Sequence, residues 1–305
     1  MTDDVQTLVD AIALGSIYAL MAVGIGLVFG VLRLVNFAYG QLIMAGAYAL
    51  ALTNDSPVLL SIALCFGVVL ALSVALEFAA FRPLRGASPT TMLVATFAIS
   101  YLLQSIALVR FGAIGKIVVV IPKLSEPVTI GSVHIRWITL VTILVAIGVF
   151  AALTLLLTRT TIGLQMRAAS IDAETARLLG VRANAVITAA VLVSGVIAAI
   201  VAVILPMAVP ERVLVSPDYA LRETIIVLVG VVVGGIDRLL SATLGGFTMG
   251  FAVGMFSGYL PSTGAWPFTS SVYLDSAVFM LVILVLLLRP EGLFARGRRT
   301  AVERL

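Results

Sequence analysis

The sequence predicts an all-α protein, a polytopic bundle of about eight or nine transmembrane helices. Of its 305 residues, 61% are hydrophobic and only 11% are charged, and the mean hydropathy is +1.19. A soluble domain ordinarily carries about 25% charged residues. Uncharged runs long enough to cross about 30 Å of hydrocarbon as a helix recur along the chain. The alternating strands of an outer-membrane barrel are not part of the pattern.

Apolar segments divide the chain into predicted spans. In order, they cover approximately 10–32, 37–53, 57–81, 91–110, 137–158, 186–208, 223–236, 240–257 and 274–289. The seventh is short for a full span, so we expect it to be tilted or broken. With eight spans, the stretch 32–41 would have to be re-entrant, and the pattern is compatible with both counts.

Basic residues divide unevenly between the two sets of connections, which predicts the orientation. The more basic set holds Arg33, Arg82, Arg85, Arg159, Arg167, Arg177, Arg182, Arg238, Arg289, Arg296, Arg298, Arg299 and Arg304. The other set holds Arg110, Lys116, Lys123, Arg136, Arg212 and Arg222. We therefore expect the C-terminal tail to be cytoplasmic and the acidic N-terminus, MTDDVQTLVD, to lie outside. Charge placed this way fits a membrane surface, and nucleic acid is not expected as a partner.

The residues of metal and nucleotide chemistry are scarce. Cys65 and His134 are the only cysteine and histidine, so we expect neither a disulfide nor a metal centre. The nearest approach to the phosphate-binding motif GxxxxGK[ST] is RFGAIGKI, with Arg110 in place of glycine and Ile117 in place of Ser or Thr. We expect no bound cofactor and no enzymatic activity in this chain.

The polar connection at 159–185, RTTIGLQMRAASIDAETARLLGVRANA, carries the signals of a short helix from about 173 to 179. Asp172 is a plausible N-cap, Glu174 lies in the first turn and Gly180 sits at the C′ position. The apolar surface of this helix would consist of Ala176, Leu178, Leu179 and Val181, flanked by Arg177 and Arg182. It either lies on lipid headgroups or docks into a groove on a partner protein.

The stretch LRLVNFAYGQ at 32–41 places polar residues between two apolar runs. As a cytoplasmic turn, it would bring Arg33 to the headgroups, let Asn36 cap the next helix and anchor Tyr39 at the interface. A functional interpretation adds that Asn36, Gly40 and Gln41 face a translocation path, where polar groups need partners in protein or water. The two interpretations are compatible.

Thr96, Ser100 and Gln104 recur every four residues in TFAISYLLQS and share one helical face. Such a stripe either joins neighbouring helices or lines the path. Glu77, close to the turn FRPLRG, is expected to snorkel and to pair with Arg82 or Arg85. We expect no buried acidic residue in mid-span, which argues against an ion-coupled transporter.

Taken together, these pieces resemble the permease subunits of bacterial branched-chain amino-acid ABC importers, the LivH-like family. The loop RAASIDAETARLLGV, the opening motif GLVFGVLRLVNFAYGQLIMAGAY, the turn FRPLRG and the tail LRPEGLF match the family pattern in order. Tyr39 and Gln41 stand where that pattern has histidine and glutamate. The resemblance implies one transmembrane permease domain over 1–305, with a cytoplasmic coupling loop at about 159–185 and a cytoplasmic tail at 290–305.

The resemblance also implies partners in a bacterial inner membrane. They are a second, similar permease subunit, most simply in a heterodimer, two cytoplasmic ATPase subunits that use the ATP, and a periplasmic substrate-binding protein. The implied ATPase-coupling residues are Asp172, Glu174, Arg177, Leu178, Leu179 and Gly180. The candidate path residues, chosen from the polar stretches described above, are Asn36, Gly40, Gln41, Thr96, Ser100 and Gln104.

The implied substrates are leucine, isoleucine, valine or related amino acids. Urea or short amides remain an alternative within the same family. An ion-coupled secondary transporter or a passive channel remains open as a different class.

Overall fold

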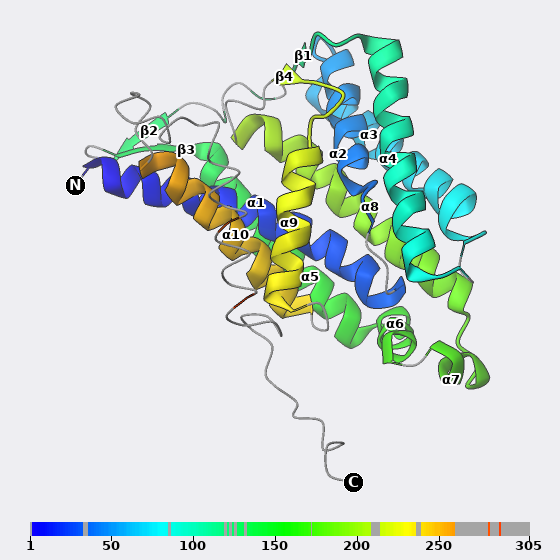
Figure 1. Cartoon of the computed structure of the whole chain (residues 1–305). Helices are drawn as coiled ribbons and strands as arrows, with labels where there is room; N and C mark the ends of the chain where they lie inside the picture. The colour runs from blue at the N-terminus through cyan, green and yellow to red at the C-terminus, as the bar shows by residue number, and fades with distance from the viewer. Residues whose placement is uncertain are drawn as a thin grey trace, which may run out of the picture.

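The computed structural model of the chain describes residues 2–32, 36–84, 87–118, 121, 124, 127–130, 133–171, 173–208, 214–235, 239–259, 280 and 287. This part of the protein is a bundle of long helices with two short β-ribbons (Figure 1). Six helices of the described part are long and apolar enough to cross a membrane, and one shorter apolar helix accompanies them. The predicted all-α membrane class is confirmed.

The apolar helices follow the predicted segments to within a few residues, except that the first begins at Thr2 and not near residue 10. The helices of the described part are α1 (Thr2–Leu32), α2 (Tyr39–Leu52), α3 (Val58–Leu76), the π-helix η1 (Glu77–Phe81), α4 (Pro89–Phe111), α5 (Trp137–Arg159), α6 (Thr161–Ile171), α7 (Ala173–Leu178), α8 (Ala183–Ala208), α9 (Leu221–Gly234) and α10 (Leu239–Tyr259). The short seventh segment forms the separate helix α9, which ends at Gly235 with φ of 107°. Apart from residues 280 and 287, the predicted ninth segment lies outside the described residues.

Two antiparallel ribbons gather at one end of the bundle. They pair β1 (Lys116–Ile117) with β4 (Leu214–Val215), and β2 (Pro127–Ile130) with β3 (Val133–Arg136). At this ribbon end, Asn54 after α2 donates its side-chain amide to the carbonyl of Ile117 over 2.7 Å. Figure 1 shows α6 and α7 at the opposite end, which we call the α7 end.

Helix α1 forms the centre of the bundle and packs against α10, α8, α5 and α9. Its contact with α10 is close because Gly246, Gly250, Gly254 and Gly258 recur every four residues. A Cβ at Gly250 would lie 2.8 Å from the Cα of Gly15 and 2.8 Å from the carbonyl oxygen of Leu14. Small residues at this spacing let two membrane helices approach until their backbones touch.

Candidate translocation path and coupling element

Residues 36–38, just before α2, are not helical. This break lies well inside the bundle. A Cβ at Gly24 would meet the Tyr39 hydroxyl at 2.2 Å, and Gly24 precedes the end of α1 by about 12 Å of helix rise. The N–H of Phe37 lies 3.5 Å from Oγ1 of Thr96, about 10 Å along α4 from its first residue. The expected surface turn is therefore wrong for residues 36–39, which form an internal break. Arg33 lies outside the described residues.

Packing fixes where α2 begins. Tyr39 is fully buried, so its predicted role as an interface anchor is wrong. Gly40 touches the start of α9, because a Cβ there would come within 2.8 Å of the carbonyl oxygen of Ala220. Gly46 likewise faces Val69 and Ala202, each 2.8 Å from a hypothetical Cβ. These close approaches place α2 between α3, α8 and α9.

Asn36 and Gln41 are buried polar residues at the break, only 4% and 1% exposed. The Asn36 side-chain oxygen accepts a hydrogen bond from the N–H of Ala38 over 3.0 Å, a local turn two residues long. The N-cap of α2 is Ala38, without a side-chain hydrogen bond, so the predicted capping of this helix by Asn36 is wrong. The Gln41 Oε1 is buried without a hydrogen bond among the described residues. At membrane depth such an oxygen is stable only beside polar groups or in a wet cavity. Asn36, Gly40, Gln41 and Thr96 thus come together around one break.

The stripe on α4 divides between two environments. Thr96 and Ser100 are buried, at 1% and 3% exposure, and Thr96 faces the break through Phe37. Gln104 instead lines a pocket of about 290 Å³ at the ribbon end, together with Tyr101, Ser105, Leu108, Ala113, Ser216, Pro217 and Asp218. Ser216 donates its hydroxyl to the Asp218 carboxylate over 2.5 Å. The stripe therefore runs from the break toward an acidic pocket.

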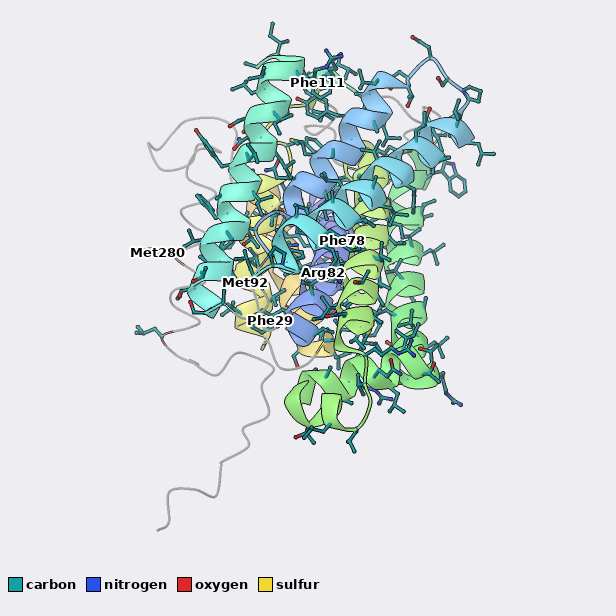
Figure 2. The ribbon with its side chains drawn as sticks, turned by 90° about the vertical axis from the view of Figure 1, so that its right-hand side faces the viewer. Phe29, Phe78, Arg82, Met92, Phe111 and Met280 are labelled. Carbon is teal, nitrogen blue, oxygen red and sulfur yellow. The ribbon has the colours of Figure 1, made fainter. Side chains whose placement is uncertain are left out.

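Two acidic side chains are buried in helices, each near an end of its helical segment. Glu77 is 1% exposed and Glu223 is 4% exposed, so the snorkelling predicted for Glu77 is wrong. Its Oε1 accepts a hydrogen bond from Oγ1 of Thr188 on α8 over 3.2 Å. Arg82 is exposed and lies over the Phe78 ring, 5.3 Å from its centroid (Figure 2). The sequence signal was Glu77 itself, a single acid inside an apolar run.

The predicted short helix in the polar connection is α7. It ends in a six-to-one turn, in which the N–H of Val181 donates to the carbonyl of Ala176 over 3.0 Å, and Gly180 has φ of 87°. Both features match the glycine C′ position expected there. Leu178 and Leu179 are 87% and 81% exposed, so the tip of α7 presents two bare leucines. Asp172 and the side chains of Glu174 and Arg177 lie outside the described residues.

A second helix in this connection, α6, was not predicted. Thr160 caps its start by accepting the N–H of Gly163 over 3.0 Å, a cap that the sequence TTIG could have revealed. A Cβ at Gly163 would lie 2.2 Å from the carbonyl oxygen of Leu156, and Met166 is fully buried. Helix α6 is thereby held against α5, and it forms a firm base from which α7 projects.

Comparison with known proteins finds one family match over most of the chain. Residues 7–288 match the family described as "Branched-chain amino acid transport system / permease component". The high-affinity branched-chain amino acid transport system permease protein BraD of Pseudomonas aeruginosa is 29% identical over 95% of both chains. The corresponding LivH proteins of Salmonella typhimurium and Escherichia coli K12 are each 28% identical, again over 95% of both chains.

Proposed function

Because this chain belongs to the branched-chain amino acid transport permease family, we propose that it carries leucine, isoleucine, valine or related amino acids through an ATP-driven importer. It is a multi-pass membrane component of a transport system and not a catalytic subunit. The observation that carries the proposal is the extent of the match, since residues 7–288 include both the break before α2 and the α6–α7 connection.

A transport system of this family implies ATPase and binding-protein partners for its permease. We propose two cytoplasmic ATPase subunits at the α7 end, a periplasmic binding protein at the ribbon end, and a second, similar permease subunit in a heterodimer. The exposed Leu178 and Leu179 support the ATPase contact, because two bare leucines at the tip of a short helix fit an apolar groove on a partner. ATP would be bound by those partners.

The proposed orientation has the α7 end in the cytoplasm of a bacterial cell. The excess of arginine in the connections assigned to that side supports it. The N-terminus would then lie outside the inner membrane and the C-terminal tail inside. The coupling loop would comprise 159–185, with Asp172, Glu174, Arg177, Leu178, Leu179 and Gly180 as its working residues.

The proposed path passes the break before α2. Asn36, Gly40, Gln41 and Thr96 would line its middle, with Ser100 and Gln104 on the way to the ribbon-end pocket. ATP binding in the partners would move α7, and the helices would alternate between outward-open and inward-open arrangements. The carboxylate of Asp218 in that pocket favours a substrate with an ammonium group. This favours amino acids over urea or short amides, the alternative within the family.

Uptake into proteoliposomes tests this proposal. The chain is reconstituted with its partner subunits, ATP is enclosed, and the binding protein and labelled leucine are added outside. We expect accumulation that stops when ATP is omitted and is inhibited by unlabelled isoleucine and valine but not by urea. Inhibition by urea alone would support the amide alternative.

The same vesicles distinguish an ATP-driven importer from the two other classes, a secondary transporter and a passive channel. Uptake driven by an ion gradient without ATP would replace the importer by a secondary transporter, with Glu77 and Glu223 as its candidate ion-binding residues. Equilibration without accumulation would indicate a passive channel.

A further inference from the structure

Where η1 meets α8, a part-buried hydrogen bond joins two side chains that the proposed transport path does not use. Glu77 opens η1, and the N–H of Arg82 donates to its carbonyl over 2.8 Å, five residues apart. This wide turn is a π-helical feature, which is uncommon and often marks a functional position. A carboxyl group that is 1% exposed among apolar helices is expensive to bury unless hydrogen bonds hold it.

The hydrogen-bond donor to Glu77 comes from the helix that follows the coupling element. Thr188 lies in the second turn of α8, and α8 begins three residues after Gly180, the end of the α7 turn. Its hydroxyl lies 3.2 Å from Glu77 Oε1 and 3.0 Å from the carbonyl oxygen of Asn184 in its own helix. One hydroxyl proton can therefore serve either acceptor, and Thr188 keeps a partner if it leaves Glu77.

Packing of α8 against its neighbours changes along the helix. Toward the ribbon end, a Cβ at Gly195 would lie 2.4 Å from Oγ of Ser73 on α3, so the two helices touch there. Between positions 184 and 192 of α8, a groove of about 390 Å³ lies between this helix and η1. It is lined by Phe78, Arg82, Asn184, Ala185, Thr188, Ala189 and Leu192. Figure 2 shows Phe78 and Arg82 together on this side of the bundle. The first half of α8 thus has an open groove on the side that faces η1 and a close contact with α3 at Gly195.

We propose that Glu77 and Thr188 form a latch that holds the inner end of α8 against η1 and opens when α7 is displaced. Glu77 is then a positioning residue that links the coupling loop to the first half of the bundle. The inference rests on the proposed function, because only an ATPase partner would supply the displacement of α7. The groove provides the room for the movement, and the Asn184 carbonyl provides the second position for the hydroxyl proton.

Distance measurement across the groove tests the latch directly. Spin labels are placed at Arg82→Cys and Asn184→Cys in a Cys65→Ser background, in the complete transporter, and pulsed electron resonance records the distance with and without trapped ATP. We expect two distance populations whose ratio changes with nucleotide. In Thr188→Val, we expect the ratio without nucleotide to shift about tenfold toward the longer distance, since the hydrogen bond to Glu77 is lost. Thr188→Ser should restore the native ratio.

A matched control is Thr158→Val on α5, an exposed threonine whose hydroxyl donates to the carbonyl of Thr154 in its own helix. We expect this variant to keep both the native distances and the native amount of leucine transported per ATP, whereas Thr188→Val should lower that amount. A distance that does not respond to nucleotide while wild-type vesicles still accumulate leucine would overturn the latch alone. Failure of the wild-type to use ATP would overturn the proposed function instead. The label pair reports on the latch even if Thr188→Val does not fold.

Discussion

Gly40 of α2 and Thr224 of α9 lie so close together that a Cβ at position 40 would come 2.5 Å from Oγ1 of Thr224. The threonine cannot turn away easily, because its hydroxyl donates to the carbonyl of Ala220 over 2.7 Å and it is fully buried. This contact joins the break after α1 to the start of α9. It therefore determines how deep in the bundle α2 begins.

Gly40→Ala should destabilise the protein. The added methyl group overpacks a site bounded by Thr224 and by the backbone of Ala220, which costs about 1–3 kcal/mol. Thermal unfolding in detergent, followed by size-exclusion fluorescence, measures the change. Gly30→Ala is the control, since none of the described residues lies within 4 Å of a Cβ there. Equal melting temperatures for the two variants would show that α2 and α9 are not held in contact.

Gly250→Ala should loosen the contact between α1 and α10. A Cβ at position 250 would meet the backbone of Gly15 and of Leu14 at 2.8 Å, and neither backbone can retreat without separating the helices. We expect a loss of about 1–3 kcal/mol, read as a lower melting temperature and a lower yield of folded protein. Gly148→Ala on α5 is the control and should melt like wild-type, because a Cβ there meets no atom of the described part of the chain within 4 Å. A stable Gly250→Ala variant would contradict the close packing.

Leu178→Asp combined with Leu179→Asp should abolish co-purification of the ATPase subunit from detergent. Both leucines are exposed, and charged side chains there cannot enter an apolar groove. The control is Ile114→Asp, because Ile114 is also 87% exposed but lies at the ribbon end. If the double variant retains the ATPase, α7 is a membrane-surface connector and its coupling role must be abandoned.

Gly180→Ala should weaken the end of α7. Its φ of 87° is unfavourable for a residue with a Cβ, at a cost of about 1–2 kcal/mol. We expect faster proteolytic cleavage after α7 and less ATPase stimulation by the binding protein. Gly180→Asn should show cleavage and ATPase stimulation between those of wild-type and Gly180→Ala, since asparagine tolerates this conformation better than alanine. Identical behaviour of the alanine and asparagine variants would argue against the strained turn.

Gln41→Leu tests the proposed path. The buried Oε1 has no hydrogen bond among the described residues, so replacing the amide with an apolar side chain of similar size should leave the melting temperature unchanged or raise it. If Gln41 contacts the substrate, ATP-dependent leucine uptake should nevertheless fall about tenfold, the effect of losing about 1.4 kcal/mol. Unchanged uptake would remove Gln41 from the path.

The sequence by itself determined the features that depend on local composition. Long apolar runs predicted α1, α3, α4, α5, α8 and α10, because crossing hydrocarbon as a helix requires such runs. The glycine at 180 predicted the end of α7, because the C′ position needs a positive φ. The order of motifs predicted the family to which the chain belongs.

Only the tertiary structure decided how deep each polar residue lies. Hydropathy along the chain cannot tell a surface turn from a break inside the bundle, because both are short polar interruptions. The contact of Tyr39 with Gly24 and that of Gly40 with Ala220 placed the break inside. Glu77 is buried rather than snorkelling because Thr188, 111 residues away in the sequence, supplies its hydrogen bond. Burial depends on which helices pack together, and that is set by contacts between residues distant in the chain.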